Sequence, residues 1–206
     1  RAAEGVVILS ASALNTISSS VVNNTGVIEA TGITQSGGKI ILDAVAGSVT
    51  NSGTLNVSSA VDTGGSIQVT ADKDITIKSG SLLDARGALG GGSIIVGGSW
   101  QNMDPTIRQA TTVTVESGAV IDASATDNGD GGTIVVRSDI TNPYSITNVA
   151  GTLLARGGLN GGNGGNVETS GAQLNIDGIQ VDTRAPQGSA GNWLLDPGDI
   201  VIGTSS

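Results

Sequence analysis

Acidic side chains recur at one place in a repeated six-residue pattern, and they are the first candidates for chemistry. Glu29, Asp84, Asp122 and Asp182 occupy this place in four copies of the pattern, and Asn56 occupies it in another. Paired carboxylates can cleave glycosidic bonds. Asp84 and Asp122 come from neighbouring copies, so they are the candidate pair for a polysaccharide lyase or hydrolase, and also for weak cation binding.

Arginines close to the same positions offer a structural explanation for these carboxylates. Arg86 and Arg184 stand two residues after Asp84 and Asp182, and Arg156 occupies the same place in a further copy. Because side chains alternate along a strand with a period of two, each arginine lies on the same side as the acidic position before it. Charge compensation on a solvated face is therefore the alternative to a catalytic or cation-binding cleft.

Two glycine-rich stretches, residues 127–131 and 157–166, have some of the features of calcium-binding turns. Asp127 and Asp130 are the acidic candidates in the first stretch. Calcium-binding nonapeptides repeat Gly-Gly-x-Gly-x-Asp at a fixed step, and this chain lacks that step and has Asn in place of Asp in the second stretch. Turns in which Asn and Asp tolerate a left-handed backbone explain both stretches. We therefore predict no cofactor, with calcium as the alternative.

The aromatic side chains are few enough to be considered one by one. Trp100 and Tyr144 fall in or beside two irregular segments, so they are candidates for stacking on a sugar ring or for anchoring a partner. A loop staple or a plug over a coil is the alternative for Trp100. Trp193 lies in a strand-like segment, which favours an interior or capping role.

The composition excludes several classes of function. The 206 residues contain neither histidine nor cysteine, which excludes the usual Ser-His-Asp triad, thiolate zinc sites, cysteine nucleophiles and disulfides. Nine Lys and Arg and a net charge of −9 leave no basic surface for nucleic acid. No apolar run is long enough to cross a bilayer, so membrane insertion is not expected. An aromatic content of 1% means that any core consists of aliphatic side chains.

Short repeated strands must position these residues. One pattern places alternating apolar residues after a glycine, and its steps are 27, 27, 38, 33 and 27 residues, from Gly26 through Gly53, Gly80, Gly118 and Gly151 to Gly178. A second pattern follows each copy and opens with two small residues, usually Gly-Gly. A third, weaker pattern occupies residues 74–77, 112–115 and 144–147.

Three short strands in each repeat indicate an all-β fold, the parallel β-helix. Each strand is too short to bury a face alone, so successive coils must stack on one another, with Ile28, Leu55 and Leu83 directed inward. We predict one β-solenoid segment, residues 1–206, of roughly six coils with surface insertions near residues 97–110 and 139–144. No sustained helical recurrence of apolar residues occurs, so no helix is predicted.

The motifs of the C-terminal part resemble a known family. They occupy residues 155–158, 161–171, 181–186 and 188–202, and the most specific is Trp193-Leu194-Leu195-Asp196-Pro197. They are similar to motifs of large exoproteins of the filamentous haemagglutinin type. The similarity covers nearly the whole chain and is strongest from about residue 116 onward.

This resemblance implies a right-handed parallel β-helix in a fibre that is exported by two-partner secretion and adheres to cells or to biofilm matrix. It implies glycan or protein receptors, an outer-membrane secretion partner for the parent protein, and a secreted or bacterial cell-surface location. The family's secretion-recognition domain has no counterpart in the sequence, so we expect an internal or C-terminal segment of a longer fibre. Self-association of such rods stays open.

Three hypotheses for function follow from these observations. The first is a non-enzymatic structural and adhesive segment. The second is a carbohydrate-active β-helix enzyme, for which Asp84 and Asp122 would be the catalytic pair. The third is a pure scaffold with no ligand of its own.

Overall fold

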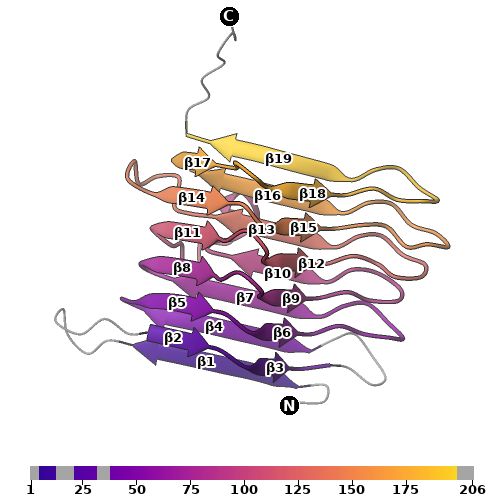
Figure 1. Cartoon of the computed structure of the whole chain (residues 1–206), viewed down its shortest axis with the longest axis horizontal. Coiled ribbons are helices and arrows are strands. Elements are labelled where there is room, and N and C mark those ends of the chain that lie inside the picture. The colour runs from indigo at the N-terminus through magenta and orange to yellow at the C-terminus, as the bar shows by residue number, and fades with distance from the viewer. Residues whose placement is uncertain (1–4, 13–20, 32–37, 199–206) are drawn as a thin grey trace, which may run out of the picture.

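The computed structural model describes residues 5–12, 21–31 and 38–198, and these residues form a stack of coils (Figure 1). Three parallel sheets run through the stack and contain seven, six and six strands. Each complete coil contributes one strand to each sheet, so the prediction of a parallel β-helix with about six coils and three strands per coil is confirmed. Gly37 and residues 199–202, which belong to the motifs found in the sequence, lie outside the described residues.

In each sheet, every strand is hydrogen-bonded to the strands of the adjacent coils. Sheet A contains, in spatial order, β1 (Val6–Ser12), β4 (Lys39–Val45), β7 (Ser66–Ala71), β10 (Ser93–Val96), β13 (Thr133–Arg137), β16 (Asn166–Gly171) and β19 (Asn192–Pro197). Sheet B contains β17 (Gln173–Asn175), β14 (Ile146–Val149), β11 (Thr112–Val115), β8 (Asp74–Ile77), β5 (Ser48–Asn51) and β2 (Val21–Asn24). Sheet C contains β18 (Gln180–Asp182), β15 (Thr152–Leu154), β12 (Val120–Asp122), β9 (Leu82–Asp84), β6 (Thr54–Asn56) and β3 (Val27–Glu29).

Ladders of aliphatic side chains fill the interior. Sheet C contributes one interior residue per coil, and the register aligns Ile28, Leu55, Leu83, Ile121, Leu153 and Val181. Leu55 and Leu83 are fully buried, and Ile28 is partly buried against the core. The three inward positions predicted from the sequence are therefore confirmed.

Glycine pairs at the start of the sheet A strands allow the coils to approach each other. A Cβ atom on Gly91 would collide with the backbone oxygen of Ala123 in the next coil. A Cβ atom on Gly92 would collide with the backbone oxygen of Gly65 in the preceding coil. Each glycine of the pair thus faces a different neighbour, which explains why the sequence repeats two glycines rather than one.

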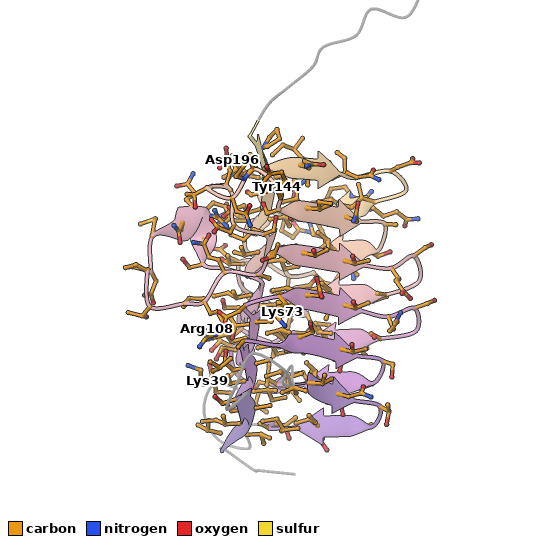
Figure 2. All side chains as sticks on the ribbon, turned by 90° about the vertical axis from the view of Figure 1, so that its left-hand side faces the viewer. Lys39, Lys73, Arg108, Tyr144 and Asp196 are labelled. Atoms are coloured by element: carbon orange, nitrogen blue, oxygen red, sulfur yellow. The ribbon has the colours of Figure 1, made fainter. Side chains whose placement is uncertain are left out.

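The predicted insertion at residues 97–110 leaves β10 and returns to β11. It contains a short 3-10 turn, η1 (Trp100–Asn102), which is the single helical element among the described residues. Figure 2 shows the insertion projecting from the coils and returning to them near Arg108. Nε of Arg108 lies 3.2 Å from Oδ1 of Asp43, and its NH1 nitrogen lies 2.6 Å from Oδ1 of Asp72. These contacts tie the insertion across the outward side of sheet A.

The prediction for residues 144–147 needs a correction, because the strand of this coil starts two residues later, at β14 (Ile146–Val149). The second insertion extends as a turn through Tyr144, and the N–H of Ser145 donates to the carbonyl of Asn142 at 2.9 Å, closing that turn. Within the described residues, no helix is long and apolar enough to cross a membrane.

Candidate functional site

The acidic positions predicted from the sequence form one column at the ends of the sheet C strands. The register aligns Glu29, Asn56, Asp84, Asp122, Leu154 and Asp182 in successive coils. Asp84 and Asp122 are direct neighbours in this column, as predicted. Leu154 interrupts the column and separates this pair from Asp182.

The surroundings of Asp84 and Asp122 are those of structural carboxylates. Oδ1 of Asp84 accepts hydrogen bonds from the backbone N–H and from Nε of Arg86, at 3.0 and 2.9 Å, and Oδ2 accepts one from its NH2 group at 2.6 Å. Oδ1 of Asp122 accepts from the N–H of Ser124 at 2.9 Å, and Oδ2 lies 3.9 Å from Nε of Arg86. Both carboxylates are buried, so the expectation of a solvated face is wrong at this pair. Because a catalytic acid or base must reach the substrate, this geometry fits charge compensation better than glycoside cleavage.

Asp84 and Arg86 form a local motif that we call the Asp-x-Arg clip, in which one carboxylate binds the backbone and the guanidinium of the arginine two residues later. Hydrogen bonding to Asp84 raises the pKa of Arg86 against the opposing effect of burial, and the charges of Asp84 and Asp122 add to the rise. A second clip joins Asp182 and Arg184, with side-chain distances of 2.9 and 2.8 Å. Hydrogen bonding from the Arg184 side chain lowers the pKa of Asp182 to about 2, although burial opposes this shift.

A groove of about 600 Å³ lies beside these clips, over the long turns that connect sheet C to sheet A. These turns project on the right of Figure 1. Arginines from three coils line the groove, namely Arg86, Arg156 and Arg184. The remaining lining includes Ser124 and a small apolar wall with Ala125, Leu159, Ala185 and Pro186. The sequence predicted the arginine positions but not the groove, because its shape depends on how the turns pack.

Arg156 differs from the other arginines of the groove. The position two residues before it holds Leu154 rather than an aspartate, so no clip forms. Among the arginines in the part of the chain that the structure describes, Arg156 alone has no salt bridge. Its backbone N–H donates to Oγ of Ser124 at 3.1 Å, and its side chain is exposed.

The two calcium candidates link successive turns. Oδ1 of Asp127 accepts a hydrogen bond from Nδ2 of Asn160 at 2.6 Å. Oδ1 of Asp130 accepts from the backbone N–H and from Nδ2 of Asn163, at 2.6 and 3.2 Å. Within residues 5–12, 21–31 and 38–198, no three acidic side chains are grouped so that they could hold a metal ion. These contacts support the interpretation as turns.

The aromatic candidates differ in their accessibility. Tyr144 is 80% exposed in the turn before β14. Trp100 is half-buried in η1, so it is less accessible than its place in an insertion suggested, and its position fits a loop staple. Trp193 aligns with the interior residue Val167, is 37% exposed, and donates from Nε1 to Oγ1 of Thr169 at 3.0 Å, which fits a capping role. The structure does not bring Trp100 and Tyr144 into the arginine-lined groove.

A buried ion pair that was not predicted from the sequence lies beneath the 97–110 insertion. The side chains of Arg137 and Glu168 are 1% and 0% exposed, and NH1 of Arg137 lies 3.1 Å from Oε1 of Glu168. Oε2 of Glu168 accepts from the backbone N–H of Gln101 at 2.7 Å, and Oε1 accepts from Oγ of Ser170 at 2.7 Å. When the second pattern is aligned between adjacent coils, Glu168 lies opposite Val135, two residues from Arg137 on the same side of the strand. This alignment of opposite charges could have identified the pair from the sequence.

The chain was compared with known proteins and structures. No protein-family model matches it, and no curated protein matches it. Among solved structures it is similar to the HMW1 secretion domain from Haemophilus influenzae, with a TM-score of 0.68 and 26% sequence identity. The match covers 93% of this chain and 48% of the other, so this chain spans about half the length of that structure. The neighbour is a secretion domain, whereas the sequence motifs indicated a segment of the fibre.

Proposed function

We propose that this chain is a structural and adhesive, non-catalytic segment of a secreted β-helical exoprotein of the filamentous haemagglutinin type. One observation carries the proposal: parallel coils run without interruption through three sheets, and this stack resembles a secretion domain over nearly the whole chain. The motifs around Trp193-Leu194-Leu195-Asp196-Pro197 support the same family. The chain is one segment of a longer protein.

The proposed mechanism is mechanical and multivalent. Ladders of hydrogen bonds stiffen the stack along its axis, because each coil is bonded to its neighbours. The long turns and the outward sheet faces then present side chains to glycan or protein receptors on cells or in biofilm matrix, and Tyr144 is one exposed candidate. Many weak contacts along one rod give an avidity that exceeds each single affinity.

An outer-membrane partner exports the parent protein in this proposal, which places the segment outside the cell or on its surface. The similarity to the HMW1 secretion domain supports a secretion partner. The absence of cysteine is compatible with this route, since the coils need no disulfide to hold them together.

The non-catalytic character follows from the proposed roles of the acidic residues. Asp84 and Asp122 are held by Arg86 and Ser124, and neither lines the groove. An enzyme acting on a polysaccharide would need carboxylates that converge on a sugar within hydrogen-bond reach. We therefore expect no turnover of pectin, alginate or hyaluronan.

Two measurements test the proposal. Beads coated with the chain should bind biofilm matrix more strongly than beads coated with the heat-unfolded chain, and an equal signal would leave only the scaffold hypothesis. Incubation with pectin, alginate or hyaluronan should release no new sugar ends. Degradation that is abolished by Asp84→Ala or Asp122→Ala would reject the non-catalytic assignment in favour of the enzyme.

A further inference from the structure

We infer that the arginine-lined groove binds a carboxylate-bearing sugar, such as a uronic acid within a polysaccharide, with the carboxylate on Arg156. This inference rests on the proposed adhesive function, because it specifies the class of glycan that the segment contacts. Three features carry it: the charge of Arg156, which has no salt bridge among the described residues, the remaining donors of the other two arginines of the groove, and the apolar wall of the groove.

The first feature is a break in a repeated pattern. Both other arginines of the groove are neutralised within their own coil, Arg86 by Asp84 and Arg184 by Asp182. Arg156 lacks such a partner because Leu154 takes the aspartate position. A guanidinium presents parallel N–H donors that match a carboxylate in two-point contact. Asp182 of the adjacent coil feels the charge of Arg156 but is hydrogen-bonded to Arg184, so the exposed side chain of Arg156 keeps its donors for an external carboxylate.

The second feature is the set of donors that the clips leave over. In each clip the carboxylate engages Nε and NH2 of the arginine. The N–H groups of NH1 are then left for neutral acceptors, since a guanidinium has five N–H donors. Because the clips neutralise these arginines, they suit hydroxyl groups better than a second anion. Arg184 lies one coil from Arg156, a spacing of about 4.8 Å.

The third feature is the apolar wall of the groove. Leu159 and Pro186 are exposed, and both line the groove beside Arg156 together with Ala125. A sugar ring combines a hydroxyl edge with a C–H face, so a uronic acid offers a carboxylate, hydroxyls and an apolar face within one residue. An acidic peptide lacks such a row of hydroxyls. The sugar therefore matches all three features of the groove.

The charges around the groove exclude densely charged polyanions. The net charge of the chain is −9, and Asp182 lines the groove itself. A ligand with several anionic groups per residue would meet these carboxylates and be repelled. One carboxylate per sugar, placed on Arg156, avoids this repulsion.

The experiment titrates the isotope-labelled chain with trigalacturonate, guluronate oligomers and a hyaluronan tetrasaccharide, and follows the Nε–H signals of the arginines by NMR. We expect at least one of these sugars to shift the Arg156 signal saturably. The methyl ester of the same sugar, which keeps the ring and removes the charge, should bind at least ten-fold more weakly.

Three variants assign the effect to Arg156. Arg156→Gln should weaken binding at least ten-fold. Leu154→Asp should do the same while retaining the arginine, because it supplies the missing partner and completes a third clip; its melting temperature should not fall below that of the parent chain. Lys73→Gln removes an exposed cation away from the groove and should leave binding unchanged.

The outcomes separate this inference from the proposed function. No binding of any of the three acids at millimolar concentration, equal binding of acid and ester, or unchanged binding in Arg156→Gln and Leu154→Asp would overturn the inference. So would a pentaglutamate peptide that binds as tightly as the sugar. Beads that still adhere to matrix without sugar binding would leave the adhesive function in place, whereas sugar binding without adhesion would contradict that function alone.

Discussion

At the scale of single residues, the Asp-x-Arg clip shows how one short motif stabilises a coil locally. Arg184 supplies a backbone N–H, Nε and NH2 to the carboxylate of Asp182, and Arg86 does the same for Asp84. The partners are two residues apart, so forming the clip orders little additional chain. A sequence can therefore place a charge pair on each coil without changing the register of the stack.

The clip at Asp182 makes stability depend on pH. The pKa of Asp182 falls from an ordinary 3.8 to about 2 in the folded chain, chiefly through its hydrogen bond with the Arg184 side chain. A carboxylate with a depressed pKa contributes stability that is fully present above its unfolded pKa and is lost as the pH falls through its folded pKa. We therefore expect the melting temperature of Asp182→Asn to fall less steeply than that of the parent chain between about pH 4 and pH 2.

Thermal unfolding monitored by circular dichroism at several pH values tests this expectation. Arg184→Gln removes the other half of the clip and should flatten the same part of the curve. Parallel curves for Asp182→Asn and the parent chain in this pH range would show that the clip contributes no pH-dependent stability.

The buried pair of Arg137 and Glu168 predicts a larger effect. Glu168→Ala leaves the charge of Arg137 buried without a counter-charge, which we expect to cost about 3–5 kcal/mol in the free energy of unfolding. The double variant Arg137→Met, Glu168→Leu removes both charges and should recover most of this loss, because replacing a buried ion pair by apolar side chains costs little net stability. Urea unfolding measures both, and a double variant as unstable as Glu168→Ala would contradict this account.

At the scale of the strands, the interior ladder of sheet C depends on one side chain per coil. Leu83 lies between Leu55 and Ile121 and is fully buried. Leu83→Ala leaves a cavity that the stacked coils cannot close, so we expect a loss of about 2–5 kcal/mol in the free energy of unfolding. Leu89→Ala removes the same atoms from an exposed turn and should change stability by less than about 0.5 kcal/mol. Similar losses in urea unfolding for the two variants would argue against an interior ladder.

Strands and the positions of the charged residues in sheet C were predictable from the sequence, because the pattern is local there, whereas the groove was not. The positions of Leu55 and Leu83 follow from alternation after a glycine, and the pair at Gly91 and Gly92 marks the start of β10. Residues 144–147 were misplaced because an insertion ends there and the local pattern cannot show how far its turn extends. The groove, the burial of Arg137 and the half-burial of Trp100 depend on how the turns and the 97–110 insertion fold back onto the coils.

At the scale of the whole molecule, the strands of each sheet pair with strands of adjacent coils, and the 97–110 insertion adds two contacts that span two coils, from Arg108 to Asp43 and from Gln101 to Glu168. Pairing in each sheet runs from one coil to the next, from β1 to β19 in sheet A. Stability is then close to a sum over coils and the interfaces between them. The net charge of −9 opposes close lateral approach of two such rods at low ionic strength.

This one-dimensional arrangement predicts a gradient of local stability along the rod. In the described residues β10 is hydrogen-bonded to β7 and β13, whereas β1 and β19 are each hydrogen-bonded to one neighbour within sheet A. Opening an end coil breaks one interface and opening a central coil breaks two, so amides of β10 should exchange at least about ten-fold more slowly than those of β1 and β19. Hydrogen exchange read by mass spectrometry on peptides covering these strands measures the gradient, with β12 as a second central strand. Uniform exchange from β1 to β19 would mean that the coils open as one cooperative unit, and the additive description of the rod would then be wrong.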